Sequence, residues 1–289
     1  MDILAEIEDK YPQFSKGQKK IADYISAHAD KAAFMTAAKL GATVGVSEST
    51  VVRFAYEIGF EGYPDLSRAL QQIIRTQLTS VQRIEVTRDR IGAGSVLEEV
   101  LTQDMDKIKR TLEETSRRDF EEAAAAIANA RSIYVIGDRS ASALARFAHY
   151  YLNLMFENVR LVTTTSSSDL FEQIMRVGSE DAVIGISFPR YSNMTVQVFS
   201  FAARSGAKII AVTDGPNSPL AQDATYLLSA RSDMNSFVDS LVAPLSLLNA
   251  LLVQVSMNKQ EEVVGTFRRL ESIWDEYHVY QNARDRAGQ

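Results

Sequence analysis

The sequence predicts an all-α domain followed by an α/β domain, the latter a flavodoxin-like three-layer sandwich around a five-stranded parallel sheet. Two observations lead to this fold class. The first 78 residues show the apolar spacing of about five helices, separated by glycine and proline turns. From Ser132 onward, short β-branched runs alternate with longer helical segments, which is the pattern of a parallel sheet covered by helices on both faces.

The composition of the 289 residues fits a folded protein with room for two domains, since 46% are hydrophobic and 24% are charged. The chain contains no cysteine, which excludes disulfides, thiolate metal sites and cysteine nucleophiles. Its three histidines lie far apart in sequence, so we expect no metal site and no cofactor. The first eight residues lack the basic region and apolar core of a secretory signal, so we expect a cytoplasmic protein without a membrane partner.

The helices of the first domain are predicted from apolar residues that recur at spacings of three and four. They are expected at Ile3–Lys10, Ser15–Ala27, Thr36–Val44, Glu48–Ile58 and Asp65–Leu78. Residues 79–94 are polar, mixed in charge and closed by Gly92 and Gly94. We therefore expect a linker there, between a domain of residues 1–78 and a domain of residues 95–289.

The stretch from Met35 to Phe60 has the features of a helix-turn-helix. Gly41 removes a side chain where two helices must cross closely, and Gly45 permits the left-handed backbone of a tight turn. Val46 would fill the corner between the helices, and Ser47 would cap the second helix through its hydroxyl group. An ordinary helical hairpin inside a globular core is the alternative.

The second helix of this motif leaves polar side chains on its outer face, in the half that would enter the major groove. The residues that we expect to bind DNA are Lys39, Ser47, Ser49, Thr50 and Arg53. The net charge of −6 does not by itself favour binding to nucleic acid, so we expect DNA binding to depend on locally placed cations. The candidates are Lys16, Lys19, Lys20, Lys39, Arg53, Arg68 and Arg75, with a solvated surface of mixed charge as the alternative.

In the second domain, the five strands are expected at Ile133–Ile136, Val159–Val162, Ala182–Ile186, Lys208–Val212 and Thr225–Leu228. Helices are expected at Ser95–Thr115, Asp119–Ala130, Ala141–Glu157, Asp169–Val177, Met194–Ser205, Ser236–Met257 and Glu261–Tyr280. Parallel strands end at one edge of the sheet, where helix N-termini favour anions.

Four polar loops would meet at that edge: Gly137–Ser142, Thr163–Ser168, Ser187–Ser192 and Thr213–Ser218. Their hydroxyl groups and two arginines predict a site for a small phosphorylated or carboxylated molecule, although serine and threonine also cap helices and fill turns. These loops contain neither Glu nor His, which disfavours acid–base isomerisation of a sugar. Asp138 and Asp214 are interpreted as turn residues and Asp169 as a helix cap.

Two sets of motifs resemble the RpiR/MurR family of bacterial transcriptional regulators, in which a helix-turn-helix domain precedes a sugar isomerase (SIS) domain. The first set runs from Val46 to Ala55 (VSESTVVRFA) and from Ile58 to Tyr63 (IGFEGY). The second is Ile186–Ser192 (ISFPRYS), with Val212–Asp214 and Ser218–Ala221. The resemblance covers residues 4 to 282, and SFPRYS marks one branch of the family.

The resemblance implies an effector site in the SIS loops. Ser187 and Ser192 match hydroxyl positions of the family, and Gly137 and Ala145 match the ends of its first loop. Arg139 stands in place of a glycine, and Ala141 stands in place of the phosphate-binding serine, which Ser140 or Ser142 could replace. The resulting candidates are Gly137, Arg139, Ser140, Ser142, Ser187, Arg190 and Ser192.

We therefore expect a DNA-binding regulator of carbohydrate-related genes that binds a double-stranded operator and is not an enzyme. A phosphosugar or other anionic metabolite would control it, and it would be a homodimer or homotetramer. Two alternatives remain: a sugar-phosphate isomerase with an appended helical domain, or a regulator whose SIS domain only forms oligomers.

Overall fold

The structure is a computed structural model of the chain, and it describes residues 3–74, 79–91, 94–163, 167–233 and 237–280. It divides into two compact units. Unit 1 comprises Met1–Gln103 with Met234–Asp239, and unit 2 comprises Asp104–Asp233 with Ser240–Gln289. The boundary therefore falls inside one helix, α8 (Val96–Glu114), whereas the sequence places the start of the second domain at Ser95. Among the described residues, no helix is long and apolar enough to cross a membrane.

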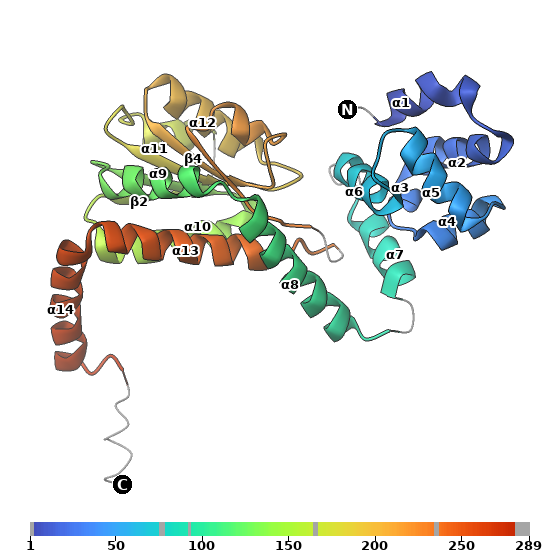
Figure 1. Cartoon of the computed structure of the whole chain (residues 1–289). Coiled ribbons are helices and arrows are strands. Elements are labelled where there is room, and N and C mark those ends of the chain that lie inside the picture. Colours follow the sequence, from blue (N-terminus) through green and yellow to red (C-terminus); the bar gives the residue numbers. More distant parts are fainter. Residues whose placement is uncertain (1–2, 75–78, 92–93, 164–166, 234–236, 281–289) are drawn as a thin grey trace, which may run out of the picture. The chain divides into compact units, whose positions relative to one another are not determined.

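The secondary-structure elements of unit 1 are helices (Figure 1). Its elements are α1 (Ile3–Lys10), η1 (Tyr11–Gln13), α2 (Lys16–Ala27), α3 (Ala29–Ala32), α4 (Ala37–Val44), α5 (Glu48–Glu57), α6 (Tyr63–Ile74) and α7 (Ser80–Ile91). Ser15 and Thr36, expected as the first residues of their helices, are the N-caps of α2 and α4. The last four residues of the helix expected at Asp65–Leu78 lie outside the described residues.

The core of unit 1 forms because each helix buries one apolar stripe. Ile21, Leu40 and Phe54 come from α2, α4 and α5, and all three are fully buried. The ring of Phe54 packs against that of Phe14, with 5.1 Å between their centroids. This core holds α4 and α5 in place, so the outer face of α5 is presented by a rigid support.

Unit 2 is built on a five-stranded parallel sheet of order β2-β1-β3-β4-β5, which confirms the predicted fold class. The strands are β1 (Ile133–Gly137), β2 (Val159–Val162), β3 (Ala182–Ile186), β4 (Lys208–Thr213) and β5 (Tyr226–Ser229). The helices after α8 are α9 (Arg117–Ala128), α10 (Ser142–Met155), α11 (Ser167–Ile174), α12 (Asn193–Arg204), α13 (Val242–Asn258) and α14 (Gln260–Glu276), with 3-10 turns η2 (Arg139–Ala141) and η3 (Pro219–Gln222).

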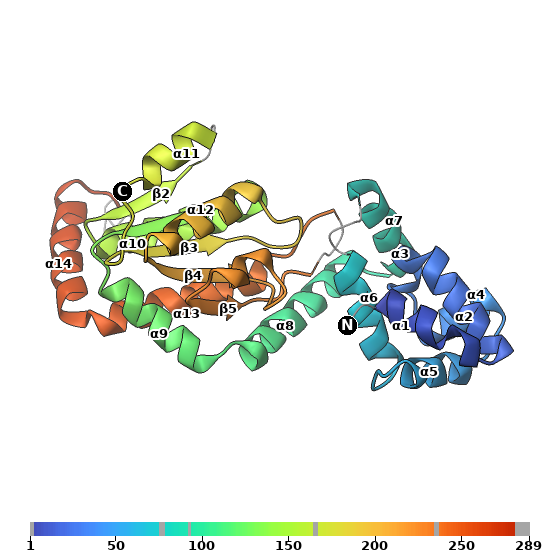
Figure 2. The same ribbon diagram turned by 90° about the horizontal axis from the view of Figure 1, so that it is seen from above.

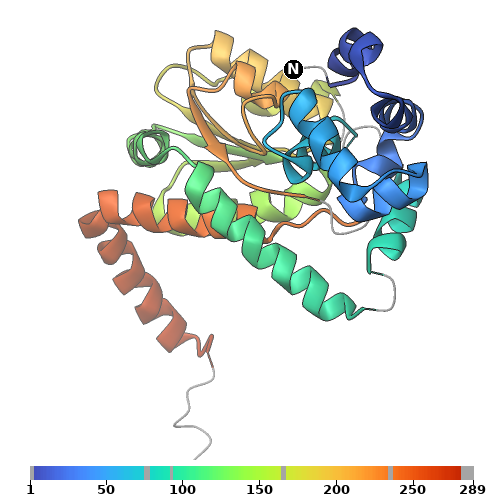
Figure 3. The same cartoon turned by 45° about the vertical axis from the view of Figure 1, so that its right-hand side comes forward.

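Two apolar layers cover the sheet because side chains alternate along each strand. In β1, Ile133 and Val135 join the core under α9, α10 and α13, whereas Tyr134 and Ile136 join the core under α11 and α12. Figure 1 shows α11 and α12 on one side of the sheet and α10 and α13 on the other, and Figure 2 looks down onto the side that carries α12. In Figure 3, α13 runs along one side of the sheet and α14 follows it at an angle.

Two expectations for individual segments need correction. The helix expected from Ser236 begins at Val242, because Pro244 lacks an N–H and fits only in the first turn of a helix. Asp169 is not a helix cap, since α11 begins at Ser167 and places Asp169 within its first turn. The segment expected as a linker carries helix α7, whose Arg83 is buried and forms a 2.7 Å ion pair with Asp239 of the same unit.

Candidate DNA interface and effector site

The turn between α4 and α5 has the backbone that its glycines predict. A Cβ atom on Gly41 would lie 2.8 Å from the carbonyl oxygen of Val46, so only glycine fits there. Gly45 ends α4 with a left-handed φ of 72°, and the Val46 N–H donates to the Gly41 carbonyl at 2.9 Å. The close crossing of the two helices therefore depends on these two glycines.

The first turn of α5 carries a cluster of hydroxyl groups. Ser47 caps the helix by accepting from the Thr50 N–H at 3.3 Å, as its position in the sequence predicts. Its hydroxyl also lies 2.9 Å from that of Ser49 and 2.8 Å from that of Thr50. Ser47 and Ser49 are exposed, whereas Thr50 is half-buried. Arg53 is exposed one turn later, and its Nε donates to the Ser49 carbonyl at 3.4 Å.

The start of α2 lies beside this cluster. A Cβ atom on Gly17 would approach the Thr50 Cγ2 to 3.4 Å and the Val46 Cγ1 to 3.6 Å. One turn further, the Nζ of Lys20 reaches the Gly45 turn, 3.8 Å from where a Cβ atom would stand. Helix α2 thus brings Lys20 to the helix-turn-helix, a proximity that the sequence alone does not reveal.

The other cations of the predicted patch are arranged differently. Lys16 and Lys39 are exposed at the first turns of α2 and α4. Lys19 lies over the Tyr11 ring at 5.3 Å, and Arg68 pairs with Asp65 at 3.2 Å. Arg75 lies outside the described residues.

In unit 2, hydrogen bonds join three loops at the carboxyl edge of the sheet. The Ser192 hydroxyl in the loop after β3 donates to Asp138 Oδ2 in the loop after β1, at 2.9 Å. The neighbouring Tyr191 hydroxyl donates to Asp214 Oδ1 in the loop after β4, at 2.8 Å. The two aspartates, interpreted from sequence as turn residues, are therefore the acceptors that connect the loops.

Several of the predicted site residues also have structural tasks within these loops. Gly137 cannot carry a side chain, since its Cβ atom would lie 2.7 Å from the Ala141 carbonyl oxygen. The Ser142 hydroxyl donates to the Arg139 carbonyl at 2.6 Å. Ser187 is buried and accepts from the Ser192 N–H at 3.2 Å.

Other hydroxyls of this edge have similar structural tasks. Thr213 and Ser218 are buried, and their hydroxyls are 2.8 Å apart. They hold the loop after β4 together. Residues 164–166, in the loop after β2, lie outside the described residues.

Arg139 and Arg190 share an unusual backbone. Their φ angles are 54° and 72°, in the left-handed region that favours glycine. Among the described residues, His278 is the one other non-glycine residue with a positive φ. Both arginines are exposed, as is the neighbouring Ser140. A strained backbone of this kind persists where the surrounding structure holds it in place, and the two residues lie in the loops that follow β1 and β3.

The described residues offer no group of three or more His, Asp or Glu side chains that could hold a metal ion. The chemistry of the edge is instead that of two cationic guanidinium groups beside hydroxyls and two carboxylates. Such a set can bind an anion through the arginines and accept hydrogen bonds from ligand hydroxyls through the aspartates.

The fold and these two surfaces define a class of protein, the helix-turn-helix regulators that carry an SIS domain. Residues 1–77 match the model of the helix-turn-helix domain of the rpiR family, and residues 126–254 match the model of the SIS domain. The HTH-type transcriptional regulator HexR of Escherichia coli is 24% identical over 286 residues, which cover 96% of this chain and 95% of HexR. The chain belongs to the RpiR family of transcriptional regulators.

Two solved structures share the fold. The sugar isomerase domain of an RpiR transcription factor from Sphaerobacter thermophilus is 28% identical, with a TM-score of 0.57. It covers 60% of this chain, and the match includes 97% of that chain. The NanR protein of Vibrio vulnificus, complexed with ManNAc-6P, is 19% identical with a TM-score of 0.58, over 97% of this chain and 100% of that one.

Proposed function

We propose that this regulator binds double-stranded operator DNA through α5 and that an anionic metabolite, most simply a phosphosugar, controls this binding from the SIS domain. The DNA-binding domain would comprise residues 1–78, and the effector-binding and oligomerisation domain residues 95–289. The protein would act in the cytoplasm as a homo-oligomer, on genes of carbohydrate metabolism.

The DNA side of the proposal is supported by the outer face of α5. Ser47, Ser49 and Arg53 are exposed on its first turns, where a recognition helix contacts base edges. Lys39 and Lys20 are exposed on the two neighbouring helices, at a suitable place for phosphate contacts. Few cations are required, because the positive N-terminal end of each helix also favours phosphate.

The effector side is supported chiefly by the strained backbone of Arg139 and Arg190. Guanidinium groups bind phosphate with two parallel hydrogen bonds, which makes up for Ala141 at the serine position of the family. Asp138 and Asp214 would accept from sugar hydroxyls, exchanging their present partners Ser192 and Tyr191. NanR, which shares this fold, was solved with the phosphosugar ManNAc-6P.

The proposed mechanism is a population shift. A ligand that exchanges the cross-loop hydrogen bonds would favour one arrangement of subunits over another. Because two recognition helices must match half-sites about 34 Å apart, a change of a few ångströms in their spacing alters operator affinity.

Two measurements test the proposal. Sequencing the genomic DNA fragments that the purified protein retains should yield a shared operator next to genes of carbohydrate metabolism. Calorimetry against a panel of sugar phosphates, sugar acids and free phosphate should then identify a ligand that changes operator affinity. A protein that retains no specific fragment contradicts the DNA assignment.

The two alternative functions, an isomerase and an SIS domain that only forms oligomers, predict different results. Turnover of a sugar phosphate by the purified protein would favour the isomerase. An operator without any ligand response would favour an SIS domain that only forms oligomers.

A further inference from the structure

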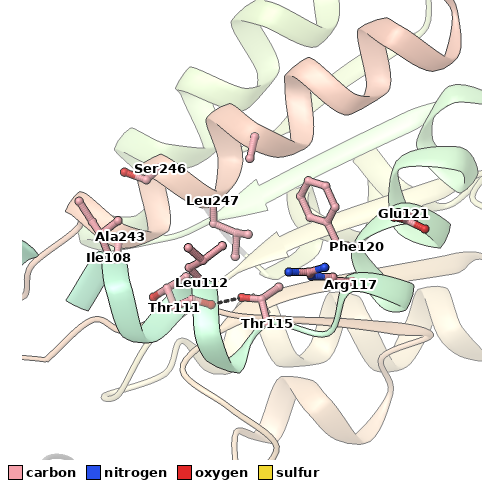
Figure 4. A pocket seen from close by; sticks show the side chains of 11 residues that line it. Ile108, Thr111, Leu112, Thr115, Arg117, Phe120, Glu121, Ala243, Ser246 and Leu247 are labelled. Atoms are coloured by element: carbon pink, nitrogen blue, oxygen red, sulfur yellow. Dashed lines mark hydrogen bonds between the residues drawn. The ribbon is translucent and has the colours of Figure 1, made fainter. Parts of the chain in front are cut away.

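Exposed apolar side chains are distributed differently along the chain. In unit 2 they are numerous, and two of them, Ile108 and Leu112, border an apolar groove of about 420 Å³ (Figure 4). Among the described residues from 3 to 74, by contrast, Tyr56 is the one large hydrophobic side chain that is exposed, and its exposed fraction is 59%. The position of this tyrosine on its helix indicates what contacts it.

Tyr56 lies on the face of α5 that carries the proposed DNA contacts. Ser49, Arg53 and Tyr56 follow one another at spacings of four and three residues. At about 100° per residue they lie within a sector of roughly 60°. All three are exposed, whereas the opposite side of the helix is buried in the core of unit 1. The ring of Tyr56 therefore extends the row of polar groups at the start of α5 by one more turn.

Two contacts fix the end of α5 that bears Tyr56. The Nζ of Lys10 on α1 donates to the Glu57 carbonyl at 3.0 Å, which satisfies one of the free carbonyl groups at the end of the helix. The Tyr56 hydroxyl lies beside Gly62, 3.8 Å from where a Cβ atom of that residue would stand. The side chain is therefore held in place before any DNA binds, which lowers the entropy cost of a contact through it.

We propose that Tyr56 determines part of the sequence specificity of this regulator, and that its ring packs on the C5-methyl group of a thymine in the operator. In the major groove, the thymine methyl is the apolar group on the edge of a base pair. An aromatic ring beside polar readout groups is suited to this partner. The inference rests on the proposed binding of DNA through α5, and it adds a residue that recognises an A·T pair.

The alternative on the same surface is a hydrogen bond from the Tyr56 hydroxyl to a DNA phosphate. Such a contact would carry no sequence information and would bury little of the ring. A contact with the thymine methyl removes apolar surface of both partners from water. The exposed carboxylates of Glu57 and Glu61, close to Tyr56 in the chain, also repel a phosphate. These observations favour the contact with the base.

The first test is the selection of operator sequences from a random duplex library by the purified full chain and its variants. Tyr56→Ala should lose the preference at one A·T position of each half-site and bind the wild-type operator about 10-fold more weakly. Tyr56→Phe restores the ring without the hydroxyl and should recover the preference. The matched control is Val81→Ala, since Val81 is 65% exposed in the same unit but lies on α7.

The second test replaces the thymine at that position by uracil, which removes the methyl group and keeps the base pairing. The wild type and Tyr56→Phe should then bind about fourfold more weakly per half-site, as expected for one buried methyl group. Tyr56→Ala should bind both operators equally, because the partner of the methyl group is already absent. Circular dichroism verifies folding, and Tyr56→Gln takes the place of Tyr56→Ala if that variant unfolds.

The inference is overturned if folded Tyr56→Ala selects the wild-type sequence with unchanged affinity, or if uracil leaves the wild-type affinity unchanged. It is overturned in favour of the phosphate contact if Tyr56→Phe binds every sequence as weakly as Tyr56→Ala, with a salt dependence reduced by about one charge. Arg53→Ala reports on the proposed function itself. If neither Arg53→Ala nor Tyr56→Ala affects the selection, DNA binding through α5 fails together with the inference.

Discussion

At the scale of single residues, the proposed effector site contains two arginines, Arg139 and Arg190, whose backbone lies in the left-handed region that favours glycine. A left-handed backbone costs a side-chain-bearing residue roughly 1–2 kcal/mol. Glycine would remove that cost while adding about 0.5–1 kcal/mol of conformational entropy to the unfolded chain. If the proposed function holds, Arg139 and Arg190 are therefore positions where the stability of unit 2 and ligand binding oppose each other.

We predict that Arg139→Gly and Arg190→Gly leave the stability of unit 2 unchanged or raise it by up to about 1 kcal/mol. Both variants should lose effector affinity, because a guanidinium group is removed. Arg139→Ala and Arg190→Ala are the controls, since they lose the same charge but keep the strained backbone. Chemical denaturation measures the stability and calorimetry the affinity. Glycine variants less stable than the alanine variants would contradict the interpretation of strain.

Arg53 provides a second prediction at this scale. Arg53→Ala should weaken operator binding by about 10-fold to 100-fold, the range expected for the loss of one base contact, while the melting temperature stays the same. The matched control is Arg88→Ala, since Arg88 is an exposed arginine of the same unit that lies on α7, outside the predicted set of DNA-binding cations. Fluorescence anisotropy with a labelled operator measures both. Equal losses in the two variants would indicate a nonspecific effect of charge.

Tyr63 makes the stability of unit 1 depend on pH. Its buried hydroxyl donates to the Ala32 carbonyl at 3.1 Å, and burial raises the pKa of Tyr63 from 10.0 to about 12. Because the folded-state pKa is raised, the neutral phenol stabilises the fold fully below pH 10, and this contribution is lost as the pH rises toward 12.

We therefore predict that Tyr63→Phe lowers stability by about 1 kcal/mol at neutral pH, through the lost hydrogen bond, and makes the alkaline decline less steep. Urea unfolding of the full chain between pH 7 and alkaline pH, followed by a signal from unit 1, measures both effects. Parallel pH profiles of variant and wild type would contradict the role of Tyr63.

At the scale of elements, the helix-turn-helix depends on how closely α4 and α5 approach. Gly41→Ala would force a Cβ atom against the Val46 carbonyl, where only 2.8 Å is available. We predict a loss of about 1–3 kcal/mol in stability together with weaker operator binding, because the helices must separate. Gly17→Ala is the matched control, since its Cβ atom meets Thr50 at an ordinary 3.4 Å. Thermal unfolding of both variants distinguishes a specific clash from a general effect of the added methyl group.

Element boundaries followed from the sequence wherever a local interaction determines them. Ser47 caps α5 as predicted, because a hydroxyl group directly before a helix can accept a hydrogen bond from a free backbone N–H of the first turn. Helix α13 begins six residues later than expected, at Val242 instead of Ser236, because Pro244 fits only in the first turn of a helix. The expected linker contains α7 because mixed charge and polarity are as compatible with a helix as with a coil.

At the scale of the whole molecule, parallel strands place loops from distant parts of the sequence at one edge. The predicted meeting of the loops after β1 and β3 is supported by the bond from Ser192 to Asp138. The partnership of Tyr191 with Asp214 was not predictable, since 23 residues and a helix separate them. The exposure of Met105 and Leu112 on α8 was equally hidden, because apolar residues at helical spacing would suit a core helix.

The sequence by itself determined the order of domains, the parallel sheet, the helix-turn-helix and the family, because these depend on periodicity, caps, turn glycines and short motifs. Only the tertiary structure decided that Asp138 and Asp214 connect the loops after β1, β3 and β4, that Arg139 and Arg190 adopt a left-handed backbone, and that Met105 and Leu112 of α8 are exposed. The reason is physical. Local patterns arise from interactions within a few residues, whereas the exposure, strain and partner of a side chain depend on segments brought together by folding.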